Sequence, residues 1–287
     1  MDVGGITRGD PGGKVSTAPA VPVEVRAPAK LTLSLRITGV RSDGYHQIES
    51  EMVTLDLADT LVFAPGDGLT VEAGTTLGTG GGEGGVQTVP TGPDNLVAQA
   101  LRAVDRTAAV RLTKRIPAGA GLGGGSADAA AVLRWAGCAD LALAARLGAD
   151  VPFCVVGGRA RVAGIGELVT PLPYVGRSFV LLLLPFGVET ASVYGAWDRL
   201  RAEGVLPAAG AAVNELEVPA IAVEPRLAQW RDLFGDATGV EPRMAGSGST
   251  WFVEGTPEEL GLEGRRTLAF GRAGARLVSV TTTPAPG

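Results

Sequence analysis

The chain of 287 residues has little of the side chains that build metal clusters or disulfide scaffolds. It contains one histidine, His46, and two cysteines, Cys138 and Cys154, without metal-ligand spacing. A single histidine excludes a multi-histidine metal site and a zinc cluster of cysteine and histidine. Two cysteines are too few for a disulfide framework, so we expect reduced, buried thiols in a cytoplasmic protein.

An excess of basic residues and a long apolar run are also missing. The net charge is −5, whereas nucleic-acid-binding proteins are typically basic. The most hydrophobic run, residues 179–185, is far shorter than the ~20 residues of a membrane-spanning helix and indicates a buried strand. The first 22 residues lack the apolar segment of a secretory signal. We therefore expect neither a nucleic-acid partner nor a membrane partner.

The spacing of apolar residues predicts a mixed α+β protein. Residues 1–22 are rich in glycine and proline and are predicted to form a disordered tail. Strict alternation from Val23 to Thr38 predicts one or two strands. Two further strands, residues 48–57 and 60–64, are predicted to be joined by a turn at Ala58 and Asp59.

Later segments alternate between glycine-rich and helical patterns. Residues 66–92 are predicted to be a flexible loop that contains a short hairpin at residues 69–72 and a glycine cluster at residues 78–85. A helix is predicted to follow the N-cap signal at Asp94-Asn95, and another is predicted over residues 214–218.

Residues 117–127 are the most informative segment. Five glycines occupy the seven positions from 119 to 125, and a helix is predicted to begin with Ser126 as its cap. Glycines let successive N–H groups point into one concavity, and a helix N-terminus adds positive potential, so the segment suits a phosphate group. Alternatives are a glycine-rich turn without a ligand and a dinucleotide site, whose G-x-G-x-x-G pattern fits Gly119, Gly121 and Gly124.

Three motifs in order resemble the GHMP kinase superfamily: Ala27-Pro28-Ala29-Lys30-Leu31, residues 117–130, and residues 244–250. The resemblance implies a two-lobed α+β fold. In that fold, residues 23–172 would form an N-terminal ribosomal-protein-S5-like α/β lobe that binds ATP. Residues 173–282 would form a C-terminal ferredoxin-like lobe, followed by a tail over residues 283–287.

Further stretches are similar to one group of that superfamily, the 4-diphosphocytidyl-2-C-methyl-D-erythritol kinases: residues 42–46, 147–153, 164–167 and 185–194. The similarity implies ATP- and Mg²⁺-dependent phosphorylation of the 2-hydroxyl of that small-molecule substrate in non-mevalonate isoprenoid precursor biosynthesis, by a monomer or homodimer. The chain departs from the pattern at Thr32, where the group usually has asparagine, and in a shorter link before Gly148. Rivals are another GHMP kinase, acting on homoserine, a mevalonate-type acid or a sugar, and a nucleotide-binding homologue without catalysis.

The resemblance also implies roles for individual residues. Asp150 would be the catalytic base and Lys30 its catalytic partner, and Ser126 would also bind Mg²⁺. The nucleotide would contact Pro117, Gly119, Gly121, Leu122, Gly123, Gly124, Gly125, Ser126 and Ala127. The substrate would contact Thr32, Tyr45, His46, Tyr194, Gly246, Ser247 and Gly248.

Each of these roles has a structural alternative. Asp150 could cap the turn before Pro152, and Lys30 could be a solvated strand lysine. His46 could be a structural histidine, and residues 246–248 a plain hairpin turn.

Overall fold

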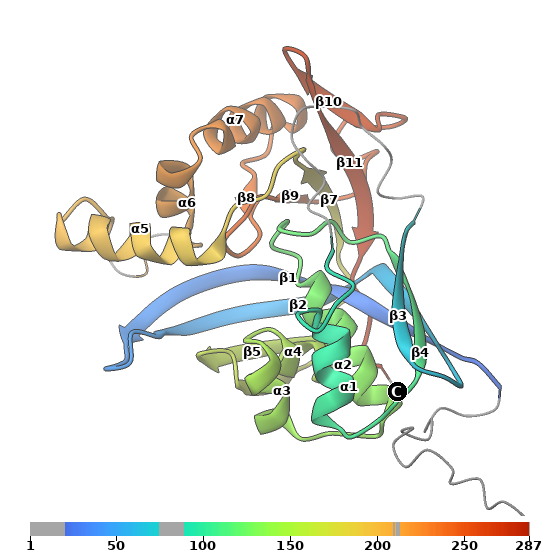
Figure 1. The fold of residues 1–287 in the computed structure, drawn as a ribbon. Helices are drawn as coiled ribbons and strands as arrows, with labels where there is room; N and C mark the ends of the chain where they lie inside the picture. The colour runs from blue at the N-terminus through green and yellow to red at the C-terminus, as the bar shows by residue number, and fades with distance from the viewer. Residues whose placement is uncertain (1–20, 75–88, 209, 211–212, 287) are drawn as a thin grey trace, which may run out of the picture.

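The computed structural model describes residues 21–74, 89–208, 210 and 213–286, which form two β-sheets with helices packed on each (Figure 1). The glycine cluster and almost all of the predicted tail at residues 1–22 lie outside the described residues. The first sheet and its helices comprise β1 (Val23–Val40), β2 (His46–Ala64), β3 (Gly68–Ala73), α1 (Leu96–Ala103), β4 (Ala109–Lys114), α2 (Gly124–Trp135), α3 (Leu141–Leu147), α4 (Val151–Val156), β5 (Arg159–Gly164) and β6 (Leu168–Leu172). The second comprise β7 (Ser178–Leu183), α5 (Thr190–Ala202), α6 (Glu217–Val223), α7 (Arg226–Thr238), β8 (Arg243–Met244), β9 (Trp251–Glu254), β10 (Thr267–Phe270) and β11 (Ala273–Thr281).

The first sheet is built around the long antiparallel hairpin of β1 and β2. The strand order is β3-β4-β2-β5-β6, with β1 paired to β2, and helices α1 to α4 cover one face (Figure 1). β3 pairs in parallel with β4. The predicted hairpin at residues 69–72 is therefore wrong, because Leu69 and Val71 pack on the core beside a partner strand.

The predicted turn at Ala58 and Asp59 is also wrong. β2 continues through both residues, which pair with Pro28 and Ala27 of β1. Aspartate favours turns because its side chain can hydrogen-bond the backbone two residues on, and its charge is costly to bury in a strand. Here the cost is offset, since the fully buried Asp59 carboxylate accepts hydrogen bonds from a lysine and two backbone amides.

The second sheet has the order β10-β11-β7-β9-β8, and α5, α6 and α7 pack on one of its faces (Figure 1). Its other face meets β1 and β2. Leu31 and Leu55 are fully buried there, against Phe179 and Phe252 of the second sheet. Because side chains alternate along a strand, Lys30 points away from this contact.

The starts of three helices test the capping predictions. Asn95 caps α1 as predicted, because its Oδ1 accepts a hydrogen bond from the Val97 amide at 2.8 Å. α2 begins earlier than predicted, with Gly123 at the cap position. α6 begins at Glu217 rather than at residue 214, because Asn214 is held by other segments.

The two cysteines differ in exposure. Cys154 is buried as predicted, and burial raises the pKa of its thiol to about 12. Cys138 is only half-buried, so that part of the prediction is wrong. Neither forms a disulfide.

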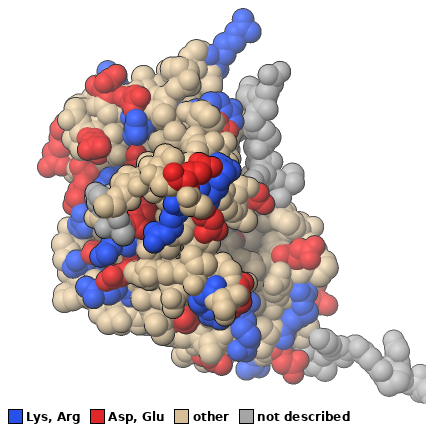
Figure 2. Space-filling model, turned by 90° about the vertical axis from the view of Figure 1, so that its left-hand side faces the viewer, with Lys and Arg blue, Asp and Glu red and all other residues tan. Residues whose placement is uncertain are grey.

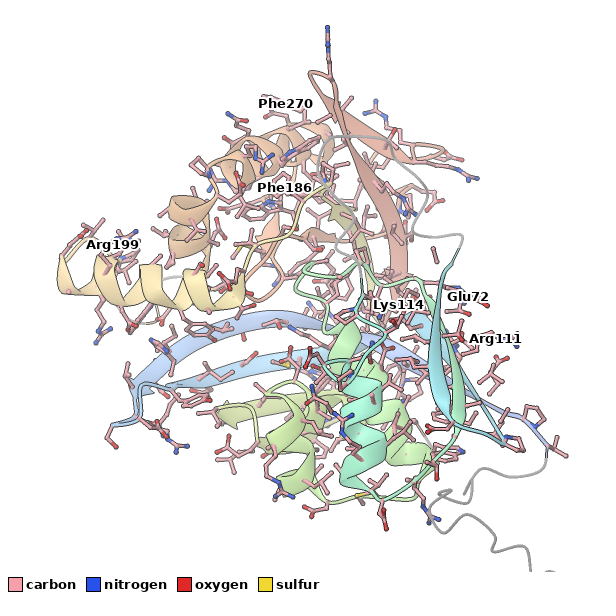
Figure 3. All side chains as sticks on the ribbon, viewed as in Figure 1. Glu72, Arg111, Lys114, Phe186, Arg199 and Phe270 are labelled. Carbon is pink, nitrogen blue, oxygen red and sulfur yellow. The ribbon has the colours of Figure 1, made fainter. Side chains whose placement is uncertain are left out.

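Three charged side chains are buried together between β2, β4 and α2. Lys114 Nζ donates hydrogen bonds to Asp59 and, at 2.7 Å, to Asp128. Lys114 reaches inward toward the start of α2, whereas Arg111 of the same strand points outward (Figure 3). The cluster joins the strand before the glycine loop to the helix after it.

The carboxylates of this cluster are satisfied unequally. Asp59 Oδ1 accepts hydrogen bonds from the amides of Arg115 and Ile116, at 2.5 and 2.8 Å, directly before the glycine loop. Asp128 Oδ1 is buried without a hydrogen-bond partner among the described residues. Burial raises the pKa of Asp128 to about 8, although Lys114 opposes the shift.

Asp128→Asn is expected to reduce the pH dependence of stability. Folding raises the pKa of Asp128 from 3.8 to about 8, so the folded state favours the protonated form. The resulting contribution to the free energy of unfolding is fully present below pH 4 and is lost as the pH rises to about 8. Asparagine stays neutral, so the free energy of unfolding should fall less over this range than in the parent. Urea unfolding at several pH values measures the difference. Equal pH slopes for the parent and Asp128→Asn would contradict the assignment.

Lys114→Met leaves two buried carboxylates without their cationic partner. This substitution should lower the free energy of unfolding by about 3 kcal/mol or more near pH 8.

Candidate functional site

In the glycine loop, residues 119–125, the side chains of Ala120 and Leu122 are buried in the core. Gly119, Gly121 and Gly123 have φ values of 69°, 74° and 67°, which glycine adopts without strain. Ala120 and Leu122 between them are 6% and 1% exposed. α2 begins directly afterwards, and the unpaired amides of its first turn carry the positive end of the helix dipole. This geometry suits a bound phosphate.

Ser126 does not cap α2, contrary to the prediction. Gly123 occupies the cap position, and Ser126 is the third residue of the helix. Its hydroxyl makes no hydrogen bond to any other residue that the structure describes. It faces Gly148, where a Cβ atom would lie 3.8 Å from Ser126 Oγ. The hydroxyl therefore remains available to a ligand between the glycine loop and the segment before α4.

Lys30 lies where the predicted motifs meet. Its side chain is 6% exposed, and Nζ lies 3.4 Å from Asp150 Oδ2. Nζ also donates a hydrogen bond to Thr32 Oγ1 at 3.1 Å. A Cβ atom at Gly123 would lie 2.8 Å from Lys30 Cγ, so only glycine fits beside the lysine stem. A solvated strand lysine is excluded.

Asp150 precedes α4, a short helix that the sequence patterns did not predict. It occupies the cap position, but its side chain makes no capping hydrogen bond, so the capping alternative is wrong. The carboxylate is 31% exposed and faces Lys30. A partly exposed carboxylate beside a buried ammonium group can accept a proton from a bound hydroxyl.

Residues 246–248 form the predicted tight turn, which lies beside Lys30 between β8 and β9. The Gly248 amide donates a hydrogen bond to the Ala245 carbonyl at 3.0 Å. A Cβ atom at Gly246 would lie 3.3 Å from Lys30 Nζ. At Gly121 it would lie 2.3 Å from the Ala245 carbonyl oxygen. The turn and the glycine loop are therefore in direct backbone contact.

Two residues that hold this turn were not predicted. Thr190 Oγ1 lies 2.9 Å from Ser247 Oγ. Asn214 is 5% exposed, and its Nδ2 donates hydrogen bonds to the carbonyls of Met244 and Gly246, at 2.9 and 2.7 Å. Thr190 is the first residue of α5 and Asn214 precedes α6, and no periodicity of the sequence reveals either contact.

The residues predicted to contact a nucleobase lie at the junction of β2 and α5. Tyr45 is 61% exposed in the turn before β2. The rings of His46 and Tyr194 are 4.8 Å apart. Burial and, secondly, the charge of Asp150 raise the pKa of Tyr194 to about 12. The structure thus brings His46 and Tyr194 together at the N-terminal half of α5.

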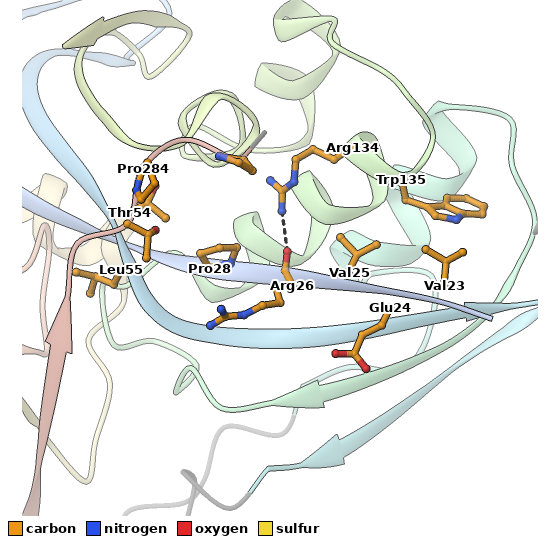
Figure 4. Close-up of a pocket in the computed structure, with 12 residues that line it drawn as sticks. Val23, Glu24, Val25, Arg26, Pro28, Thr54, Leu55, Arg134, Trp135 and Pro284 are labelled. Atoms are coloured by element: carbon orange, nitrogen blue, oxygen red, sulfur yellow. Dashed lines mark hydrogen bonds between the residues drawn. The ribbon is translucent and has the colours of Figure 1, made fainter. Parts of the chain in front are cut away.

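A cavity of about 510 Å³ lies away from this site (Figure 4). It is lined by Arg26, Arg134, Trp135 and Pro284 among others. Arg134 belongs to the last turn of α2, where it donates a hydrogen bond to the Arg26 carbonyl at 2.9 Å. α2 has 12 residues and is therefore ~18 Å long. The cavity and the glycine loop thus lie at opposite ends of one helix.

Surface charge, metal-binding groups and membrane-spanning helices are further signs of function. Basic and acidic residues are interspersed on the face that carries the free end of α5, without a field of one sign (Figure 2). No three His, Cys, Asp or Glu side chains within the described ranges are grouped to hold a metal ion. In the same part of the chain, no helix has the length and apolar character needed to cross a membrane.

Comparison with known proteins gives consistent relatives. Residues 95–158 match the family model of the GHMP kinases N terminal domain. The 4-diphosphocytidyl-2-C-methyl-D-erythritol kinase of Paracoccus denitrificans is 39% identical over 240 residues, covering 79% of this chain and 84% of that protein. The protein of the same name from Paramagnetospirillum magneticum is 37% identical over 259 residues, covering 79% and 87%.

Solved structures share the fold. A 4-(cytidine 5'-diphospho)-2C-methyl-D-erythritol kinase aligns with a TM-score of 0.63 at 31% identity, covering 92% of this chain and 100% of the other. A mevalonate kinase aligns with a TM-score of 0.53 at 13% identity, covering 91% and 99%, which shows the fold alone. The predicted two-lobed α+β fold is confirmed, and it is that of a GHMP kinase. Within this class, the chain belongs to the 4-diphosphocytidyl-2-C-methyl-D-erythritol kinase family.

Gly121→Ala is expected to weaken nucleotide binding by about tenfold to a hundredfold, because the new methyl group would push the glycine loop off the turn at Ala245. Gly137→Ala is the matched control. Gly137 also has a positive φ, 70°, but a Cβ atom there meets nothing within 4 Å. Both variants carry the backbone strain of ~1–2 kcal/mol. Calorimetric titration with a non-hydrolysable ATP analogue should separate them, and equal affinities would contradict the close contact.

Proposed function

We infer that this chain transfers the γ-phosphoryl group of ATP to the 2-hydroxyl of 4-diphosphocytidyl-2-C-methyl-D-erythritol, a step of non-mevalonate isoprenoid precursor biosynthesis. Curated relatives of which the chain covers more than four fifths carry the name of this kinase. The structural observation that supports the inference most is the buried Lys30 beside Asp150, between the glycine loop and the turn at Gly246.

Asp150 would accept the proton of the substrate 2-hydroxyl as its oxygen attacks the γ-phosphorus. The bond between that phosphorus and the β,γ-bridging oxygen breaks, and ADP leaves. Phosphoryl transfer needs mainly positioning and charge neutralisation. Lys30 Nζ, 3.4 Å from Asp150, would orient the carboxylate and offset negative charge on the transferred group.

The amides at the start of α2 would hold the ATP phosphates from the other side. Gly124, Gly125 and Ser126 form the first turn of the helix, where backbone amides lack intrahelical partners. Anions bind such helix ends through these amides and the helix dipole. The substrate hydroxyl and the γ-phosphate would then meet between Asp150 and the glycine loop.

The residues present fit a magnesium ion that arrives with the nucleotide. Ser126 offers a hydroxyl that neither caps α2 nor bonds another described residue. Mg²⁺ is commonly held by one or two protein oxygens together with substrate phosphates and water. When bound, it would neutralise part of the phosphate charge. Ser126 is the side chain that we propose as its ligand.

The nucleoside end of the substrate would lie beside Tyr45, His46 and Tyr194. An exposed Tyr45 can stack on a base without prior rearrangement of the core. Thr32, Ser247 and Gly248 would line the path from there to the reacting hydroxyl. The hydroxyl of Thr32 already accepts a hydrogen bond from Lys30, so the threonine in place of the usual asparagine retains a polar contact.

Asp150→Asn is expected to lower kcat by about a hundredfold or more, because the amide cannot accept the proton. The affinity for ATP should change by less than about twofold, since the glycine loop is untouched. Release of ADP in the presence of the cytidyl substrate measures kcat, and calorimetry measures ATP affinity.

Asp236→Asn is the matched control, because Asp236 is an exposed aspartate on α7, in the second sheet's helical layer. This control should retain the parent rate. An Asp150→Asn variant with at least half the parent kcat would rule out the proposed base. A parent enzyme that phosphorylates another alcohol but not the cytidyl substrate would overturn the substrate assignment.

A further inference from the structure

The imidazole of His46 is held by one face of α5. Its ring lies 4.8 Å from the Tyr194 ring and 5.4 Å from the Trp197 ring, which it meets edge-on at 89°. His46 Nε2 lies 2.8 Å from Asp198 Oδ1. The three partners occupy positions i, i+3 and i+4 of the helix and therefore share a face. Together they fix the orientation of the imidazole.

Asp198 determines which ring nitrogen carries the proton. A carboxylate only accepts hydrogen bonds, so Nε2 of His46 must be the N–H. In the neutral ring, Nδ1 is then an acceptor. Nδ1 has no hydrogen-bond partner among the described residues. The buried polar atoms that lack a partner in this part of the chain are Asp128 Oδ1, Thr250 Oγ1 and Trp251 Nε1, so Nδ1 is not buried. It therefore reaches solvent with its lone pair available to a ligand.

The imidazole is connected to the turn at Lys30 through α5. His46 packs on Tyr194, which follows Thr190 by one helical turn, and Thr190 Oγ1 lies 2.9 Å from Ser247 Oγ. Tyr45, the neighbour of His46, is exposed. A base that stacks on Tyr45 would bring the edge of its ring to His46.

We propose that Asp198 is a positioning residue for base selection: it holds the proton of His46 on Nε2, so that Nδ1 accepts a hydrogen bond from an amino-bearing base such as cytosine. Uracil carries a carbonyl oxygen in place of that amine, and two acceptors would then face each other. A site that loses its hydrogen bond in this way rejects the analogue. The proposal rests on the proposed function, because it takes the nucleoside end of that substrate as the ligand.

The first test is spectroscopic and needs no turnover. His46 is the only histidine of the chain, so the imidazole signals of ¹⁵N-histidine-labelled protein belong to it. At about pH 9, where an ordinary histidine is neutral, the parent should show a protonated Nε2 and an unprotonated Nδ1. Asp198→Ala should show a mixture of tautomers. Added cytidine diphosphate should shift the Nδ1 signal of the parent, and added uridine diphosphate should shift it less. A parent protonated on Nδ1, or an unchanged tautomer in Asp198→Ala, would overturn the proposal.

The second test measures specificity. The ratio of kcat/KM for the cytidyl substrate to that for its uridyl analogue should fall by about tenfold in Asp198→Ala. The loss should come from a higher KM for the cytidyl substrate, with kcat within about twofold. Asp198 is half-exposed on the helix surface, so the substitution leaves the core intact. Glu203→Ala removes the same charge from the end of α5 without touching His46, and it should leave the ratio unchanged.

The two tests separate this proposal from the proposed function. If the parent turns over the cytidyl substrate and Asp198→Ala keeps the parent ratio of the two kcat/KM values, the role of Asp198 is overturned and the proposed function stands. Absence of turnover in the parent, together with the expected tautomer and a cytidine-specific shift, sinks the function and supports the proposal.

Discussion

A single buried ammonium group, Lys30 Nζ, joins segments that are far apart in the sequence. Burying a lysine is costly unless charged and polar partners surround it. Asp150 and Thr32 supply these partners, at 3.4 and 3.1 Å. The lysine stem also leaves no room for a side chain at Gly123, and its Nζ would be in tight contact with a Cβ atom at Gly246. The strand with Lys30, the glycine loop and the turn at residues 246–248 are therefore arranged around one charged side chain.

The rest of the molecule holds that arrangement in place. One face of β1 packs into the apolar contact between the two sheets, which leaves Lys30 directed toward the glycine loop. Behind the loop, the buried Lys114 links Asp59 of β2 to Asp128 of α2. The loop is thus fixed from the strand before it and from the helix after it. Such preorganisation is what phosphoryl transfer asks of a protein.

Features with a periodic or local signal could be predicted from the sequence. Strand alternation gave β1, and the capping residue Asn95 gave the start of α1. The glycine loop and the resemblance of the motifs indicated the fold and which residues to expect at the site. Interactions between distant segments left no such signal. Asp59 was predicted in a turn because its partners lie more than 50 residues away. The partners of Asn214 and Asp198 are likewise brought close only in the folded chain.

The geometry around Lys30 leads us to expect phosphorylation of the 2-hydroxyl of the cytidyl substrate. Phosphorus-31 NMR of the products formed from ATP, Mg²⁺ and this substrate tests it most directly. We expect one new phosphomonoester signal, coupled to carbon 2 of the erythritol unit, that grows in step with ADP. Release of ADP without a new phosphomonoester, or a phosphoryl group on a different hydroxyl, would contradict it.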